Sequence, residues 1–306
     1  MLYDQTLKTI KALSKEKLSG ATEIEAKALE AFTYFIGHTH DGSLASFRDK
    51  LTTLCIQLAQ AQPSMASLFN LSNDILHISN AEESIKEIKE SLTTCFTHYD
   101  CTDSILRYAV ELLSENSCIV THSRSSIVLQ ILTKIGQGLH VICTESRPLN
   151  EGRRLASELA SSGATVTLVV DTAIFSLLQK AECVLFGADA VTPLGVVNKI
   201  GTMGIANVAT EQGIPVYAAT SLHKLCPYSF PISLRDHHEV WENPPGDIKV
   251  KNFYFDITPL SHIDKFLTEK GVLDPSNITE NIQSIQVAPQ LLSILTQIPR
   301  DDRVII

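Results

Sequence analysis

An aspartate and a lysine in the second half of the chain have the residue types and spacing of a site that moves protons and binds an anion. Asp189 directly follows an apolar run, where its carboxylate would be partly dehydrated and its pKa raised. Further along, Asn198 and Lys199 precede a predicted helix start formed by Gly201 and Thr202. That start would supply a cation and free backbone N–H groups to a phosphate. A loop-capping aspartate and a solvated lysine fit the spacing equally well.

A second cluster, with the sequence ESRPLNEGRRL, combines arginines with a proline and a glycine. Arg147, together with Arg153 or Arg154, offers planar bidentate donors for a phosphate. Gly152 would let the backbone pass close to a ligand. We expect at least one of these arginines to face the site, and the alternative is a surface helix on which Glu151 pairs with Arg154 at i,i+3 spacing.

Both clusters belong to a repeated pattern in which a short apolar run ends in small, polar or charged residues. In an open parallel sheet, ligands bind outside the carboxyl ends of the strands, where helix N-termini and loop side chains converge. The pattern therefore predicts one site assembled from several strand ends. The runs are Cys118–Val120, Val141–Cys143, Val166–Val170, Val184–Phe186 and Val216–Ala219.

The elements that position these residues divide the chain into two parts. Up to about residue 115, apolar residues recur at helical spacing, which predicts an all-helical domain of about six helices. From residue 116, strand-length runs alternate with amphipathic stretches, which predicts a Rossmann-like domain with a mostly parallel sheet over residues 116–306. The fold class is therefore α/β. The irregular segment 227–247 is a candidate lid or partner surface. Helices are predicted at 125–135, 151–161, 173–179 and 201–212.

Composition excludes several classes of function. The chain has 306 residues, 34 acidic and 25 basic, and its net charge of −9 argues against direct nucleic-acid binding and against anionic membrane surfaces. No apolar run approaches the ~20 residues that span a bilayer, and the N-terminal segment lacks a signal-peptide core, so we expect a cytoplasmic protein. Seven scattered cysteines without a CxxC pair predict reduced core thiols.

The sequence predicts neither a metal nor a cofactor. The histidines of segments 38–41 and 237–239 lack an evident third ligand. No GxGxxG fingerprint for nicotinamide binding occurs, despite the Rossmann-like layout.

Taken together, the motifs resemble one family. It contains the aldose-1-phosphate isomerases, namely methylthioribose-1-phosphate isomerase and ribose-1,5-bisphosphate isomerase, and the alpha, beta and delta subunits of translation initiation factor 2B. The resemblance implies a helical domain, a Rossmann-like domain, assembly through that second domain into a homodimer or larger particle, and a sugar-phosphate site at the strand ends. The strings are KLSGATEIEAKAL (17–29), QPSMASLFN (62–70), THSRSSIV (121–128), TESRPLNEGRRL (144–155), LVVDTA (168–173), GADAVTPLGVVNKIGT (187–202), FDITP (255–259) and TEKGVLDP (268–275).

Three positions depart from the isomerases that the chain resembles. Ser123 stands where they have a cysteine, whose thiol works with the aspartate matching Asp189 to move protons. An alcohol is a far weaker acid than a thiol and needs a neighbouring base. Ser19 replaces the arginine of an Arg-Gly-Ala motif whose glycine matches Gly20. Glu151 replaces the usual glutamine of the methylthioribose enzymes, and its negative charge disfavours their substrate.

We therefore expect a protein like the alpha subunit of initiation factor 2B, which binds a phosphorylated sugar or nucleotide and is regulatory rather than an efficient isomerase. The first alternative is a ribose-1,5-bisphosphate-type isomerase with Ser123 and Asp189 as its acid/base pair, and the second is a subunit that makes only protein contacts. His122 is the nearest base to Ser123, although a structural role fits its position better. The resemblance assigns ligand binding to Gly20, Arg147, Arg154, Asn198, Lys199, Gly201 and Thr202.

Overall fold

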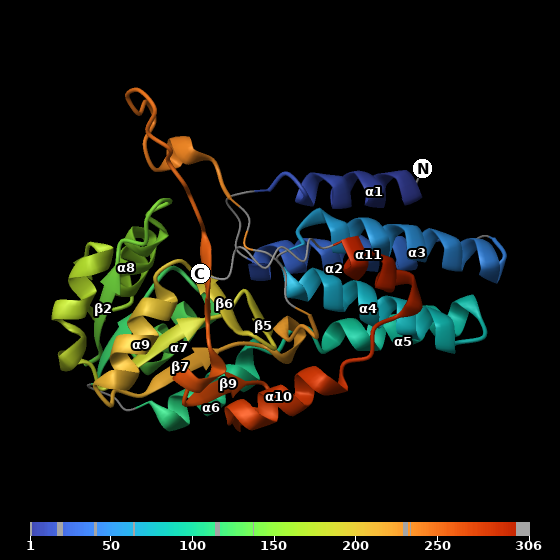
Figure 1. Ribbon diagram of the computed structural model, residues 1–306. Coiled ribbons are helices and arrows are strands. Elements are labelled where there is room, and N and C mark those ends of the chain that lie inside the picture. The colour runs from blue at the N-terminus through green and yellow to red at the C-terminus, as the bar shows by residue number, and fades with distance from the viewer. Residues whose placement is uncertain are drawn as a thin grey trace.

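The computed structural model describes residues 2–16, 21–39, 42–63, 65–113, 117–136, 138–228, 232 and 234–297. Figure 1 shows a layer of stacked helices at one end of the molecule and a sheet covered by helices at the other. The predicted α/β fold class, with a helical part followed by a mostly parallel sheet, is confirmed.

Six helices precede the first strand among the described residues. Apolar residues at helical spacing bury the facing sides of α1 to α5 in one core, which includes Phe32, Leu51 and Leu71. The last helix, α6, packs instead against the sheet through Ile105 and Ala109. The bounds are α1 (Leu2–Leu13), α2 (Ala21–His38), α3 (Leu44–Ala61), α4 (Ala66–Ala81), α5 (Ile85–Thr97) and α6 (Thr102–Leu112).

The large sheet has seven strands in the order β10-β9-β7-β4-β1-β2-β3, and all neighbours pair in parallel except β10 with β9. All five predicted runs are strands of this sheet, so their carboxyl ends meet along one edge. The bounds are β1 (Cys118–Thr121), β2 (His140–Thr144), β3 (Thr165–Val169), β4 (Cys183–Gly187), β7 (Val216–Ala219), β9 (Lys265–Thr268) and β10 (Gly271–Leu273).

Helices cover both faces of the sheet. α6, α7 (Ser126–Ile135) and α8 (Glu151–Ser161) share a core with one face. α9 (Thr202–Glu211) and α10 (Pro275–Ser284) share a core with the other. The helix predicted at 173–179 is instead two short 3-10 turns, Asp171–Ser176 and Leu178–Lys180.

A second, antiparallel sheet joins two short strands of the segment that follows Asp189 to a strand near the end of the chain. Its order is β5-β6-β8, with β5 at Ala190–Thr192, β6 at Gly195–Lys199 and β8 at Phe255–Thr258. The turn before β6 needs Gly195, because its φ is +145° and a Cβ there would lie 2.1 Å from the carbonyl oxygen of Thr258. This small sheet places Lys199 at the end of a strand.

Two asparagines of α4 tie the helical layer to the rest of the chain. Nδ2 of Asn70 donates to the carbonyls of His223 and Leu225 at 2.7 and 2.6 Å. Asn73 donates to the carbonyl of Gln286 at 2.8 Å and accepts the N–H of Ala288 at 2.8 Å. The segment that follows contains a 3-10 turn (Pro289–Leu291) and α11 (Leu292–Gln297), and its residues Ala288, Leu291 and Ile294 complete the helical core.

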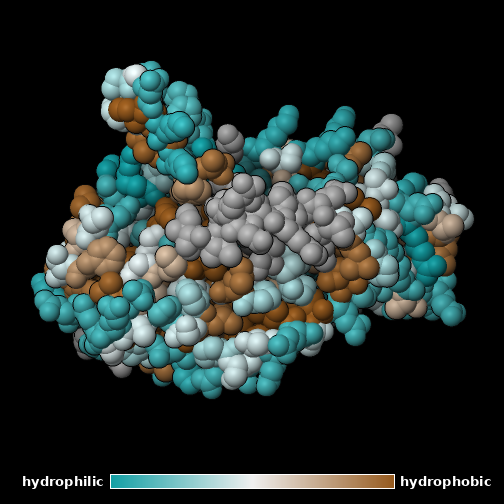
Figure 2. Space-filling model, viewed as in Figure 1, coloured by the Kyte–Doolittle hydropathy of each residue, from teal (hydrophilic) through white to brown (hydrophobic). Residues whose placement is uncertain are grey.

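Residues 234–253 form a projecting segment that stands out from the sheet half, orange in Figure 1. Its base is closed by a bridge between Leu234 and Phe253. Figure 2 shows hydrophobic and hydrophilic residues together on this projection, and Val240, Trp241 and Ile248 are exposed. Its role as a lid or partner surface stays a prediction. Among the described residues, no helix is both long and apolar enough to cross a membrane.

Candidate functional site at the strand ends

A chain of hydrogen bonds fixes Ser123 at the end of β1. Its N–H donates to Oγ of Ser146 at 2.8 Å, and the Ser146 and Thr144 hydroxyls lie 3.0 Å apart. The Thr144 hydroxyl is 2.5 Å from Nδ1 of His122, whose Nε2 is 2.8 Å from the carbonyl of Ile200. Because a carbonyl only accepts, Nε2 carries the proton and Nδ1 accepts. Burial lowers the pKa of His122, so the neutral imidazole acts as a structural link.

Glu151, the first residue of α8, joins Ser123 to Lys199. The Ser123 hydroxyl donates to Oε1 of Glu151 at 2.9 Å, and Nζ of Lys199 lies 2.6 Å from the same oxygen. Lys199 is only 5% exposed, with Nζ 5.0 Å from the centre of the Tyr254 ring. α8 can start here because Gly152 packs on β2, where any Cβ would lie 1.8 Å from the carbonyl oxygen of Thr144.

Asp189 is half-buried directly after β4, as the sequence predicted. Burial raises the pKa of its carboxyl, and the charges of Lys224 and Lys199 oppose that rise. Lys224 is buried and donates to the carbonyl of Ala188 at 2.8 Å. Within the described part of the chain, the Asp189 side chain makes neither a hydrogen bond nor an ion pair. A carboxyl in this position is suited to exchanging a proton with a ligand.

The predicted phosphate cradle at the start of α9 is already occupied by a side chain. Oδ2 of Asp256 on β8 accepts the N–H groups of Gly201 and Met203, at 2.7 and 3.2 Å. The expectation of free N–H groups at these two residues is therefore wrong, because a buried carboxylate caps the helix. Asn198 donates to the hydroxyl of Thr202 at 3.0 Å, and both side chains are buried in this cap.

None of the three arginines is buried. Arg153 pairs with Glu145, and Arg154 pairs with Glu158 at 3.0 Å on the outer face of α8. Arg147 is exposed, and its guanidinium donates to the carbonyl of Val240 in the projecting segment at 3.3 Å. Ligand binding by Arg147 and Arg154 stays a prediction, and Gly20 and Ser19 lie outside the described residues.

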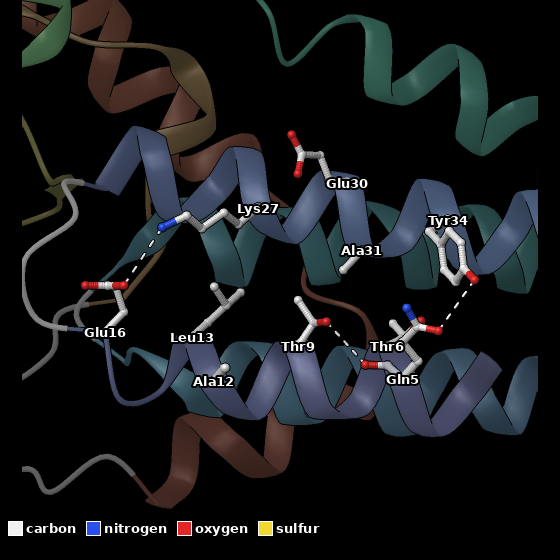
Figure 3. Close-up of a pocket in the computed structure, with 10 residues that line it drawn as sticks. All are labelled: Gln5, Thr6, Thr9, Ala12, Leu13, Glu16, Lys27, Glu30, Ala31 and Tyr34. Atoms are coloured by element: carbon white, nitrogen blue, oxygen red, sulfur yellow. Dashed lines mark hydrogen bonds and ion pairs between the residues drawn. The ribbon is translucent and has the colours of Figure 1, made fainter. Parts of the chain in front are cut away.

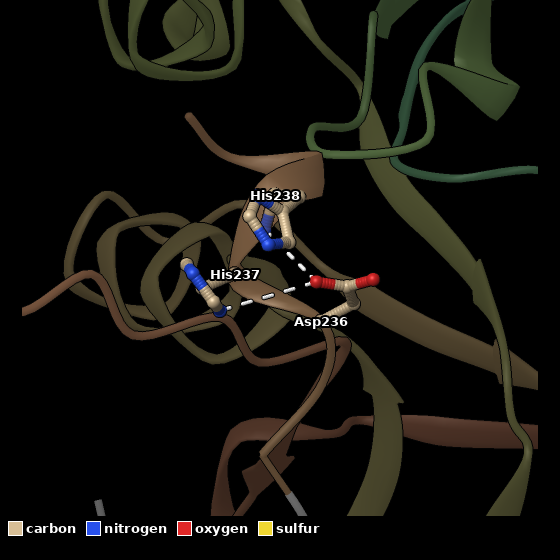
Figure 4. Close-up of side chains that lie close together, drawn as sticks. All are labelled: Asp236, His237 and His238. Carbon is tan, nitrogen blue, oxygen red and sulfur yellow. Dashed lines mark hydrogen bonds and ion pairs between the residues drawn. The ribbon is translucent and has the colours of Figure 1, made fainter. Parts of the chain in front are cut away.

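The projecting segment is connected to the site through Tyr254. The Tyr254 hydroxyl donates to the carboxylate of Glu239 at 2.6 Å, while its ring lies beside Lys199. Glu239 is therefore bound to Tyr254, and it does not belong to the neighbouring cluster of exposed potential metal ligands. In that cluster, Asp236, His237 and His238 bring ligand atoms within 4.8 Å of one another (Figure 4). The expectation that the protein takes no metal stays a prediction.

The helical layer also has a cavity, and it lies away from the strand ends. It is about 410 Å³ in volume and lies between α1 and α2 (Figure 3). Its lining includes Gln5, Lys27, Glu30 and Tyr34, and no residue of the strand-end site contributes to it. We place the functional site at the strand ends, because the buried charged side chains converge there.

The sequence did not identify two residues of the site, Lys224 and Asp256, as a ligand-binding residue and a helix cap. Lys224 lies shortly after the end of β7, and a cation at that position is the sequence signal that could have identified it as a site residue. Asp256 stands in the FDITP string at an inward position of β8, where a carboxylate in a strand predicts a buried acceptor. Neither signal identifies a partner, because the sequence does not predict the strands β5 and β6, and it is the pairing of β6 with β8 that brings Asp256 to α9.

Comparison with known proteins assigns the chain to a family. The model of the initiation factor 2 subunit family matches residues 17–275. The chain belongs to the initiation factor 2 subunit family. This family member is 29% identical to ribose 1,5-bisphosphate isomerase of Methanocaldococcus jannaschii, over 87% of this chain and 91% of that protein. It is 31% identical to a putative translation initiation factor eIF-2B subunit 2-like protein of Pyrococcus abyssi, over 90% of this chain and 98% of that protein.

Among solved structures, the family member is similar to a translation initiation factor eIF-2B from Pyrococcus horikoshii OT3. The TM-score is 0.76 at 27% identity, covering 89% of this chain and 98% of that one. The resemblance stated from the motifs is thus confirmed at the level of the family. The relatives include proteins named as isomerases and proteins named as initiation factors, so the choice between these activities depends on the site itself.

Proposed function

We propose that this family member binds a phosphorylated sugar or nucleotide at the strand ends and acts as a regulatory protein of the initiation-factor-2B-alpha type in the cytoplasm. The observation that carries the proposal is the Ser123 hydroxyl, which donates to Glu151 at 2.9 Å where the resembling isomerases have a thiol. A hydroxyl hydrogen-bonded to a carboxylate that also pairs with Lys199 is a poor proton donor for rapid turnover.

A phosphate ligand is supported by the charges at this edge of the sheet. Lys199 and Lys224 are both buried. Lys199 is paired with Glu151 and Lys224 donates to the carbonyl of Ala188, and a phosphate bound beside them would add the negative charge that buried cations favour. The name of the isomerase relative makes a pentose phosphate the first ligand to test. In this proposal Lys199 and Lys224 contact phosphate oxygens, whereas Asn198, Gly201 and Thr202 shape the strand end that holds Lys199.

The second candidate function is an aldose-to-ketose isomerase of the ribose-1,5-bisphosphate type. One observation favours it, namely the raised pKa of the half-buried Asp189 carboxyl. In such a reaction Asp189 would exchange a proton with the sugar and Ser123 would serve as its partner. No cofactor is needed for this chemistry, since the substrate is only rearranged.

Self-association through the sheet half belongs to the same proposal. Among the described residues, the outer strand β3 has no partner strand on one side. Leu168 within it and Val170 directly after it are 43% and 56% exposed. Exposed apolar residues on a sheet edge favour an interface between copies. Sedimentation of Val170→Glu against wild type tests this; a monomeric wild type would overturn it.

The decisive test is thermal unfolding with ribose 1,5-bisphosphate, methylthioribose 1-phosphate, ribose 5-phosphate and AMP. A ligand at ~100 times its Kd adds about 2.7 kcal/mol, a shift of a few degrees in Tm. The shift should disappear in Lys199→Met and persist in Lys265→Met, which removes the same charge from the start of β9 at the opposite edge of the sheet. No shift with any compound would refute ligand binding. Rapid conversion that is lost in Asp189→Asn would establish the isomerase instead.

A further inference from the structure

One carboxylate oxygen accepts from two donors that come from different strand ends. Oε1 of Glu151 receives the Ser123 hydroxyl at 2.9 Å and the Lys199 ammonium at 2.6 Å. The other oxygen, Oε2, is buried and has no hydrogen-bond partner in the described part of the chain. All the hydrogen bonds that the structure gives this carboxylate therefore end at a single point between β1 and β6.

That point has the properties of a subsite for a phosphate oxygen. A hydroxyl and a buried ammonium that converge within hydrogen-bond distance form charge-assisted hydrogen bonds with any oxyanion placed between them. Lys199 is held there, because it is 5% exposed and its Nζ lies beside the Tyr254 ring. A buried ammonium needs a negative charge close to it, and the Glu151 carboxylate supplies that charge.

We propose that Glu151 occupies an anion subsite formed by Ser123 and Lys199, and that a ligand phosphate binds there by displacing the Glu151 carboxylate. This inference rests on the proposed function and deepens it, because it makes Glu151 the residue that sets the affinity for phosphate. Every ligand competes with an anion that is covalently attached to the site, so binding is weaker than the two donors alone would allow.

The position of Glu151 in the fold permits this displacement. It is the first residue of α8, and its side chain is 24% exposed, in contrast to the buried Lys199. Rotation outward breaks only the two contacts of Oε1, since Oε2 has none. The displaced carboxylate stays at the N-terminus of α8, where the helix dipole favours a negative charge. Ser123 and Lys199 can then donate to the phosphate without moving.

Glu151→Gln is the direct test, because glutamine keeps the shape and an oxygen acceptor while removing the charge. Titration calorimetry with inorganic phosphate should show binding at least about tenfold tighter in Glu151→Gln than in wild type. Glu211→Gln is the matched control, since it removes an equal charge from the exposed far end of α9 and should leave the Kd unchanged. The gain should vanish in the double variant Glu151→Gln/Lys199→Met.

Ribose 5-phosphate, titrated into the same variants, separates this inference from the proposed function. Equal or weaker phosphate binding in Glu151→Gln overturns the inference, while sugar-phosphate binding by wild type would still support the proposed function. Tighter binding of inorganic phosphate, without binding of ribose 5-phosphate in any variant, supports the subsite and overturns ribose 5-phosphate as the ligand of the proposed function. If neither probe binds any variant while circular dichroism shows folded protein, both the subsite and ribose 5-phosphate as the ligand are overturned.

Discussion

The buried Asp256 carboxyl makes the stability of this protein depend on pH in a way that one substitution can isolate. Burial raises its pKa from 3.8 to about 6, so the folded state holds this proton more tightly than the unfolded chain. The resulting stabilisation is fully present below pH 3.8 and is lost as the pH rises through 6. The difference of about two pKa units is worth about 3 kcal/mol in total, of which about 1.4 kcal/mol separates pH 5 from pH 7.

Asp256→Asn removes this titration and keeps an oxygen acceptor for the N–H groups of Gly201 and Met203. The cost of the substitution itself does not depend on pH, and every other titrating group is common to both proteins. The free energy of unfolding of wild type minus that of Asp256→Asn should therefore increase by about 1.4 kcal/mol on going from pH 7 to pH 5.

Urea unfolding of both proteins at pH 5, 6, 7 and 8 measures this difference directly. Buffers without phosphate or sulfate are required, because an anion that binds the folded state would add its own stabilisation. A difference that stays constant from pH 5 to pH 8, or that increases toward alkaline pH, would refute the assignment of a raised pKa to this helix cap.

Three further substitutions test other parts of the structure. Gly201→Ala should cost about 1–3 kcal/mol in urea unfolding, because φ is +106° and the new Cβ would lie 3.1 Å from Nε2 of His122. Gly204→Ala, inside the same helix and with room for a methyl group, should not destabilise the protein. Asn70→Ala should lower the free energy of unfolding by about 2–3 kcal/mol, since the buried carbonyl of Leu225 and the partly buried carbonyl of His223 lose their donor. Asn281→Ala within α10 should cost less than about 1 kcal/mol. Asp189→Asn should bind ribose 5-phosphate no less tightly than wild type by calorimetry, because a negative charge is removed, and should abolish any turnover; unchanged turnover would contradict a role in proton transfer.

The sequence predicted the large sheet because its signals are local. Continuous apolar runs followed by polar residues identify buried parallel strands, and all five predicted runs are strands. Asp189 was placed correctly after β4 for the same reason. The sequence did not predict β5 and β6, because these strands have only three and five residues and the second begins at Gly195. Such short segments around a glycine are typical of a loop.

The contacts within the site could not be predicted, because they depend on which segments meet in space. Nothing local in the sequence indicates that Glu151 reaches Lys199, or that Asp256 takes the N–H groups at the start of α9. An arginine on an amphipathic helix can face either way by small changes of register, so Arg154 could not be oriented from spacing alone. Its pairing with Glu158 differs from both partners that the sequence suggested.

The return of residues 288–294 to the helical core has a consequence for how the protein is made. The core of α1 to α5 is filled in part by Ala288, Leu291 and Ile294, which are synthesised after the whole sheet. Contacts between residues so far apart in sequence form late and slow the folding reaction. On the ribosome, the first helices emerge long before these side chains exist, and their apolar surface stays uncovered meanwhile. The helical layer is therefore synthesised before the sheet and is among the last parts to be completed.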